Sequence, residues 1–427
     1  MGIQRDGQQR CRPGITRRGM VSRGIASVAG GLLAATGTGR ALAAPAWQAT
    51  PMAGGARDRA ADIVAIAREA MAAADLRAVI VRVVIDGQEI VTTALGESIT
   101  GVPATTDMHF RNGAVVFSYI STLLLRLVDR GLAALDDPIA AWLPNLPDAD
   151  RVTLRMLVNM TAGYPDYVQN QTLLQAVYDD PFRQWTNADL IEIGLSTPRV
   201  FDPGTNWDYS HTNFVILGEA LEKIGGRPLA DLLEAEVLAP LGLRNTVSSS
   251  TAAIPEPALH AFSSERREAL GIPAGTRFYE ESTYWNPSWT TAEGAVQTTD
   301  IADVAASMAA IGEGTLLSEE SHRAQLDRGL LGFGAPLDGC PNCHTLNEQY
   351  NYGLGIVFHG DWLLQNPLFA GFAAIGGYYP SGKIAVAAAS TFGEGSFDDQ
   401  GNYKPEWQNL FEGIASYLAP GSLPPAR

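Results

Sequence analysis

The order of strand-like and helix-like segments is the feature that most constrains the fold of this chain. Two apolar, β-branched segments, Ala78–Ile85 and Glu89–Ala94, flank an Asp86-Gly87 turn that is typical of a β-hairpin. Further strand patterns follow much later, at Tyr352–Phe358, Phe369–Gly377 and Lys383–Ala389. The long stretch between the two groups is helical and rich in loops. We therefore expect an α/β plus all-α architecture, in which an antiparallel sheet from both chain ends is flanked by helices and carries a helical insertion.

Helical periodicity sets the approximate borders of these parts. Apolar residues recur with helical spacing in Arg57–Ala74, and a long apolar helix is expected from Val115 to Gly131, where the glycine ends it. Shorter helices are expected at 153–159, 187–195, 213–225, 228–238, 299–312, 318–327 and 405–418. These patterns predict one domain over 57–420, with a sheet lobe at about 57–113 and 345–420 and a helical lobe at about 114–344. Residues 44–56 would then be a linker and residues 421–427 a tail.

Residues 1–43 have the pattern of an export signal. Twin arginines lie within Thr16–Val21, an apolar run follows at Ile25–Thr38, and Ala41-Leu42-Ala43 offers a small-residue cleavage site. The apolar run is shorter than the ~20 residues that a membrane span needs, and no other segment is long enough. We therefore expect an exported protein, located in the periplasm, at the cell wall or in the medium, with no stable membrane span after signal removal. A disordered basic N-terminus is the alternative.

The net charge limits the partners of the mature chain. The whole sequence has a formal net charge of −16, and residues 1–43 contain seven arginines and one aspartate. Removal of that segment would leave 23 basic and 45 acidic residues, which is a net charge of −22. Because such a protein repels polyanions and has no basic patch, we expect no binding to nucleic acid or to anionic lipid surfaces.

Two of the three cysteines remain after signal removal, since Cys11 lies within residues 1–43. Cys340 and Cys343 are three positions apart, and in an exported protein this spacing predicts a short structural disulfide. His344 completes the C-x-x-C-H pattern of haem attachment, but the loop is rich in Gly, Pro and Asn and has no nearby second axial ligand. Two cysteines and an adjacent histidine also do not supply separated tetrahedral ligands. We therefore expect no cofactor and no metal.

Several motifs follow one another at specific spacings. His109–Gly113 leads into the long apolar helix, and Leu135–Pro138 and Trp142–Pro144 come after it. Next come the segments Val152–Leu157, Thr161–Tyr167, Phe201–Gly204, Tyr209–Asn213 and Tyr352–Gly355. This succession, over about residues 60–415, resembles the family of serine β-lactamases and penicillin-binding proteins, in the group of class C β-lactamases, D-alanyl-D-alanine carboxypeptidases and esterases. The resemblance implies a β-lactamase/transpeptidase-like fold and a serine that a lysine one helical turn later activates, the S-x-x-K motif.

The resemblance places the family's catalytic serine at Ala114 and the lysine at Phe117. Alanine has no nucleophile and phenylalanine has no base, so neither role can be filled at these positions. Ser118 and Ser121 lie on the same expected helix, but neither has a lysine three residues later. Either would be a non-standard nucleophile.

The other two motifs of the family are altered as well. Tyr209 stands at the tyrosine that the family uses in proton transfer, and His211 stands where asparagine is usual. Because histidine titrates near neutral pH, the pair forms either a retained polar pocket or structural hydrogen bonds at the base of a helix. The third motif aligns with Gln365-Asn366-Pro367, where the proline lacks a backbone donor beside the oxyanion pocket. His359-Gly360 is the alternative alignment.

Further pocket residues are expected from the same resemblance. Glu293 stands in a stretch where the family has small residues, and it is either a general base beside Tyr209 and His211 or a surface residue displaced by a loop change. The remaining residues expected to line the pocket are Asn112, Ser118, Tyr164, Asn213, Gln365 and Asn366.

Three functions are compatible with these residues. The first is a pseudoenzyme that binds a small molecule or a peptidoglycan-type ligand without serine-based turnover. The second is a hydrolase of esters, amides or β-lactam-like substrates in which Tyr209, His211 or Glu293 activates water. The third is a serine hydrolase with a non-standard serine. The oligomeric state stays open at this stage.

Overall fold

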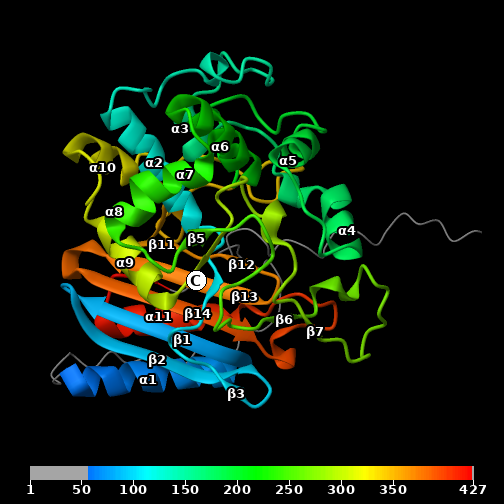
Figure 1. The fold of residues 1–427 in the computed structure, drawn as a ribbon, viewed down its shortest axis with the longest axis vertical. Helices are drawn as coiled ribbons and strands as arrows, with labels where there is room; N and C mark the ends of the chain where they lie inside the picture. Colours follow the sequence, from blue (N-terminus) through cyan, green and yellow to red (C-terminus); the bar gives the residue numbers. More distant parts are fainter. Residues whose placement is uncertain (1–55, 426–427) are drawn as a thin grey trace, which may run out of the picture.

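The computed structural model describes residues 56–425, so the predicted signal segment 1–43 and the linker up to residue 55 lie outside the described residues. Its main feature is a nine-stranded sheet with the order β3-β2-β1-β14-β13-β11-β10-β9, in which β12 also pairs with β13. Every pairing in this sheet is antiparallel. Figure 1 shows the blue N-terminal strands lying beside the orange C-terminal strands. The expected sheet assembled from both ends is therefore confirmed.

Strand β14 lies inside the sheet, between β1 and β13. The strands are β1 (Leu76–Ile85), β2 (Gln88–Ile99), β3 (Val102–Pro103), β9 (Asn351–Tyr352), β10 (Val357–His359), β11 (Trp362–Gln365), β12 (Leu368–Phe369), β13 (Phe372–Tyr379) and β14 (Ile384–Phe392). All residues of β14 are buried, as expected for a central strand covered on both faces. It pairs with β1 from Ala78↔Thr391 to Ile85↔Ile384.

Helices cover both faces of the sheet (Figure 1). On one face, α1 (Ala56–Ala73) packs against α11 (Asn409–Leu418), and both contact sheet strands. On the other face, α9 (Ile301–Gly312) packs on β1, β13 and β14. The helical part beyond α9 contains α2 (Val115–Asp129), α3 (Leu154–Val158), α4 (Gln171–Asp179), α5 (Asn187–Gly194), α6 (His211–Gly225), α7 (Leu229–Leu233), a π-helical turn at Glu234–Leu238, α8 (Ala239–Leu241) and α10 (Glu319–Gln325).

The helical part also contains two small sheets, which the sequence patterns did not predict. One has the order β4-β8-β5, from β4 (Phe110–Arg111), β8 (Gln297–Thr299) and β5 (Val247–Ser248). The other pairs β6 (Phe262–Ser263) with β7 (Glu280–Glu281). These strands are only two or three residues long, so they lack the alternation by which a strand is recognised in a sequence.

One expected strand is wrong in a way that bears on the site. The segment expected as a single strand at 352–358 is divided into β9 and β10, because the chain bends away between them. Gly355 in this bend has a φ of +66°, and a Cβ at that position would lie 2.6 Å from the carbonyl oxygen of Phe117. Only a glycine fits where the bend approaches α2 so closely.

Other borders also differ from the prediction. Helix α6 begins at His211, two residues earlier than expected, and the strand β11 and the helix α4 were not predicted. The described part of the predicted tail contacts the main sheet. Ser422 Oγ accepts a hydrogen bond of 2.7 Å from the indole N–H of Trp362 in β11. Within residues 56–425, no helix is both long and apolar enough to cross a bilayer.

Candidate functional site

The N-terminus of α2 forms one wall of the candidate site. Ala114 is the N-cap residue of this helix, and its side chain makes no capping hydrogen bond. Gly113 before it has a φ of +52°, and a Cβ there would lie 2.4 Å from Cβ of Pro367. The start of α2 is therefore pressed against the segment after β11. The sequence placed the third motif in this segment, at Gln365-Asn366-Pro367.

A cavity lies between these two segments. Its lining combines apolar groups with a few polar side chains, as small-molecule sites commonly do. The lining residues are Gly113, Ala114, Phe117, Tyr209, His211, Trp289, Thr290, Asn366, Pro367, Leu368 and Phe369. The cavity has a volume of about 30 Å³. This volume is enough for about two waters or a small group of a larger ligand.

Phe117 is fixed by aromatic neighbours one helical turn after Ala114. Its ring stacks on Phe214 of α6 with centroids 3.9 Å apart and planes 13° from parallel. The rings of Tyr209 and His211 follow at 6.0 Å and 5.8 Å. Since the Phe117 side chain is 1% exposed, it belongs to the core as much as to the cavity wall. The position that the resemblance assigns to the lysine is thus occupied by a packed ring.

The two serines on α2 face the protein interior. Ser118 Oγ donates to the carbonyl oxygen of Val115 at 2.7 Å, within the helix. Ser121 Oγ donates to the carbonyl oxygen of Leu354 at 2.6 Å. Both residues are 0% exposed, and neither lines the cavity. The geometry therefore speaks against a non-standard serine nucleophile at these two positions, and it does not place Ser118 in the pocket.

His211 is held by a carboxylate that the sequence reasoning did not single out. Its Nδ1 lies 3.1 Å and 3.3 Å from the two carboxylate oxygens of Asp166, and its backbone N–H donates to the same group at 3.0 Å. Because a carboxylate only accepts, the proton of the ring is held on Nδ1. Nε2 has no protein partner among residues 56–425, and His211 lines the cavity. The ring can thus accept a proton from a group in the cavity.

Tyr209 lies beside His211, and its ring centroid is 5.4 Å away from the imidazole. Burial, with smaller contributions from the neighbouring tyrosines Tyr352 and Tyr350, raises the pKa of Tyr209 well above its ordinary value. A phenol of this kind stays protonated at neutral pH, so Tyr209 can donate a hydrogen bond but cannot serve as the base.

Glu293 does not join Tyr209 and His211. Its carboxylate accepts from the backbone N–H of Asn187 at 3.2 Å, and its own N–H donates to Asn187 Oδ1 at 2.7 Å. This places Glu293 at the N-terminus of α5, where the helix favours a negative charge. It lines a different pocket, with Ser249 and Ser250. The interpretation of Glu293 as a general base in this site is therefore wrong.

Most of the other expected pocket residues have structural partners. Asn112 Nδ2 donates to Gln297 at 3.0 Å, the Tyr164 hydroxyl donates to the carbonyl oxygen of Pro147 at 2.7 Å, and Gln365 Nε2 donates to that of Gly355 at 2.8 Å. Asn213 contacts the sulfur of Met160 at 3.6 Å. Of the expected pocket residues, only Asn366 lines the cavity.

The predicted disulfide between Cys340 and Cys343 is present. Its loop lies behind the cavity wall, because Asn342 Nδ2 donates to the carbonyl oxygen of Tyr209 at 3.1 Å.

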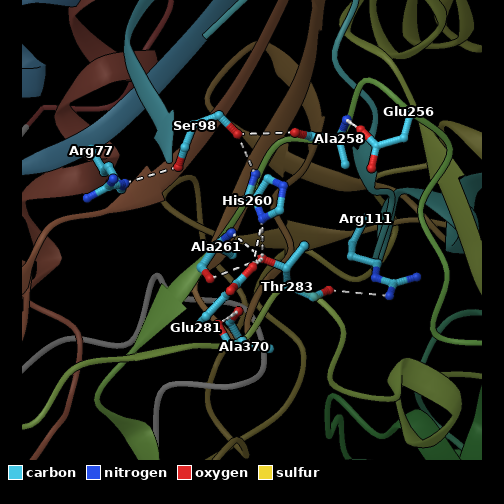
Figure 2. Close-up of polar contacts among 11 residues, drawn as sticks. Arg77, Ser98, Arg111, Glu256, Ala258, His260, Ala261, Glu281, Thr283 and Ala370 are labelled. Atoms are coloured by element: carbon cyan, nitrogen blue, oxygen red, sulfur yellow. Dashed lines mark hydrogen bonds and ion pairs between the residues drawn. The ribbon is translucent and has the colours of Figure 1, made fainter. Parts of the chain in front are cut away.

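A second cluster of polar side chains lies around β6 and β7 (Figure 2). His260 Nδ1 is 2.7 Å from Glu281, and Thr283 Oγ1 donates to the same carboxylate oxygen at 3.0 Å. The backbone N–H of His260 donates to Ser98 of β2 at 2.8 Å. Arg111 of β4 donates to the carbonyl oxygen of Thr283 at 3.5 Å, and burial lowers its pKa to about 10. The cluster joins strands of three sheets and does not line the cavity, so we interpret it as structural.

Comparisons with known proteins show which family the chain is similar to. The model of the family described as Beta-lactamase matches residues 63–407. Penicillin-binding protein 4 of Amycolatopsis lactamdurans is 33% identical over 165 residues, which cover 38% of this chain and 40% of that protein. Esterase EstB of Burkholderia gladioli is 32% identical over 164 residues, which cover 35% of this chain and 41% of the esterase. The match thus spans about two fifths of the length of these relatives.

A solved structure extends the likeness to the whole fold. A D-stereospecific amidohydrolase from Streptomyces sp. superposes on 83% of this chain and 98% of its own, with a TM-score of 0.66 and 23% sequence identity. This likeness shows a β-lactamase/transpeptidase-like arrangement of antiparallel sheet and helices. Since the family model covers most of the chain, the protein belongs to the Beta-lactamase family.

Proposed function

We propose that this protein is an exported, β-lactamase-related pseudoenzyme that binds a small molecule or a cell-wall peptide without forming an acyl-enzyme on a serine. The packing of Phe117 against Phe214 carries this proposal. That stack occupies the position that the resemblance gives to the lysine, one helical turn after the position that it gives to the serine. A site without nucleophile and base retains binding and polar stabilisation, which give only a small part of the rate of an intact site.

The cavity supports a binding role. The cavity lining is largely apolar, and its polar side chains are those of Tyr209, His211, Thr290 and Asn366. This combination holds one small polar group of a ligand in a fixed orientation while the rings around it exclude water. The names of the relatives include a penicillin-binding protein and an esterase, which is consistent with a ligand that carries an amide or an ester group.

Intact-mass spectrometry after incubation with a fluorophosphonate and with benzylpenicillin tests the absence of acylation. We expect no added mass on the wild-type protein, whereas an active penicillin-binding protein in parallel samples gains the probe. An adduct on any serine would overturn the proposal. Binding is tested separately by calorimetry with D-alanyl-D-alanine dipeptide, for which His211→Ala is expected to weaken the affinity measurably.

A second candidate function rests on the contact between Asp166 and His211. A carboxylate on Nδ1 leaves Nε2 as the base, which is the arrangement that activates a hydroxyl or a water in hydrolases. Water in the cavity could then attack an ester without an acyl-enzyme. This function predicts slow ester hydrolysis that is lost in both His211→Ala and Asp166→Ala. Equal rates in the wild type and both variants would remove it.

Export is the part of the proposal that rests on residues 1–43. The twin arginines at Arg17 and Arg18 predict transport of the folded chain. Expression of the full chain with Arg17→Lys and Arg18→Lys is expected to leave the protein in the cytoplasmic fraction, whereas the wild type reaches the periplasm or the medium. Equal distribution of both proteins would contradict the export proposal and leave the site proposal untouched.

A further inference from the structure

The disulfide loop has a buried acid next to its sulfur atoms. A carboxylate oxygen of Asp208 and the sulfurs of Cys340 and Cys343 all lie within 4.8 Å of one another. All three residues are buried, with exposed fractions of 4%, 7% and 5%. The disulfide closes a loop of only four residues. Because a cross-link removes less entropy from the unfolded chain when the loop that it closes is short, a stabilising role alone explains this bond poorly.

Asp208 is a carboxyl group without a balancing cation. No salt bridge involves it within residues 56–425, and its backbone N–H donates to the carbonyl oxygen of Met160 at 3.1 Å. Burial, followed by the nearby carboxylate of Asp166, raises the pKa of Asp208 to about 8, while the side chain of Asn342 acts in the opposite direction. At neutral pH the group therefore carries a proton that it can give to a neighbouring sulfur.

The loop around the disulfide is tied to the segment that lines the cavity. Asn342 donates to the carbonyl oxygen of Tyr209 at 3.1 Å. Asn206 exchanges two hydrogen bonds with the backbone of Ala335, at 2.8 Å and 3.1 Å. The ring of His344 packs edge-on against Trp207 at 5.0 Å. The loop is thus in direct contact with the residues from Asn206 to Tyr209.

We propose that Cys340, Cys343 and Asp208 form a thiol–disulfide exchange site that accepts two electrons from a dithiol. A thiolate of the dithiol attacks one cysteine sulfur and breaks the S–S bond, which gives a mixed disulfide. The other cysteine leaves as a thiolate and takes the proton of Asp208. The second thiol of the donor then attacks its own mixed disulfide, so the donor becomes a disulfide and the protein holds two thiols. The two protons that the donor releases balance those gained by the cysteines, and one of them restores Asp208.

The experiment measures the reduction of the folded, full-length chain by dithiothreitol near neutral pH. Samples are quenched at intervals with a maleimide, and each is analysed by intact mass. The wild type is expected to gain two maleimide adducts beyond those present before reduction, while its circular dichroism stays native. A variant with Cys340→Ser and Cys343→Ser is expected to gain none. If the wild type gains the two adducts only after denaturation, the disulfide is structural and the proposal fails.

Two matched variants test the role of the acid. Asp208→Asn keeps the shape but has no proton to give, and we expect reduction to slow by about tenfold or more. Asp202→Asn makes the same change on the same segment at a side chain that is 68% exposed, and it should be reduced at the wild-type rate. An Asp208→Asn protein that folds and is reduced as fast as the wild type would exclude Asp208 from the exchange. Tryptophan fluorescence, to which Trp207 contributes, gives an independent readout, since reduction is expected to change it in the wild type and not in the double serine variant.

Discussion

The ring of Phe117 lies flat against the ring of Phe214, with centroids 3.9 Å apart, and this contact joins α2 to α6 beside the cavity. Phe117→Ala removes a fully packed ring from this contact. We expect the free energy of unfolding to fall by about 3–5 kcal/mol, because a cavity remains where the ring was. Urea denaturation measures this loss. Phe182→Ala is the matched control, since Phe182 is 66% exposed and its change should stay within about 0.5 kcal/mol.

The two serines of α2 should differ in their effect on stability. Ser121→Ala leaves the buried carbonyl oxygen of Leu354 without its donor, so we expect a loss of about 1–3 kcal/mol in the free energy of unfolding. Ser118→Ala removes only a bond to the preceding turn of the same helix, and the loss should be smaller. If both variants lose the same free energy of unfolding, the hydrogen bond from Ser121 of α2 to the bend after β9 contributes no more to stability than the bond of Ser118 within the helix.

Asp166 should set the tautomer of His211. In the wild type we expect the ring proton on Nδ1, because the carboxylate accepts from it at 3.1 Å. In Asp166→Ala the proton is expected to shift toward Nε2, and ¹⁵N NMR of the histidine ring measures this shift. The signals of His260 serve as the internal control, because its partner Glu281 is unchanged. A His211 spectrum that does not change in Asp166→Ala would show that the pair does not form in solution.

Asp208 should make stability depend on pH. Its pKa is raised from 3.8 to about 8 in the folded chain, so between these values the folded state holds a proton that the unfolded state has released. The stabilisation from this proton is complete below the unfolded pKa and is lost as the pH rises through the folded pKa. This group alone lowers the free energy of unfolding by at most about 1.4 kcal/mol per pH unit over that range.

The measurement is urea denaturation of the wild type and Asp208→Asn at several pH values between about 4 and about 8. We expect a shallower fall with pH in the variant, because the asparagine cannot titrate. Parallel curves for both proteins would contradict the raised pKa of Asp208.

The hairpin of β1 and β2, the strands β13 and β14 and the helices that cover them were predictable because their patterns are local. The valines and isoleucines of β1 and the buried run of β14 are visible in short windows of sequence, and so is the amphipathic face of α1. The bend at Gly355 was not predictable, since it exists only because another helix approaches there. A glycine in the sequence does not indicate which other segment of the chain packs against it.

The contacts in the candidate site were also not predictable from local sequence patterns. His211 was recognised from its place in a motif, but its partner Asp166 lies 45 positions earlier and carries no local sign of that pairing. The sequence left two places open for Glu293, in the site or at the surface, and in the structure it caps α5, where its carboxylate accepts from the backbone N–H of Asn187. Asp208 stands beside Tyr209 in the sequence, yet burial and the nearby carboxylate of Asp166, both results of the fold, raise its pKa.

The pairing of β1 with β14 has a consequence for how the chain is made. Ala78 finds its partner Thr391 only when nearly all of the protein has left the ribosome. Until then, one of the two edges of β1 has no partner strand, and long-range pairing of this kind forms slowly. A chain that stops before β14 therefore lacks the strand that joins β1 to β13, around which both ends of the sheet assemble.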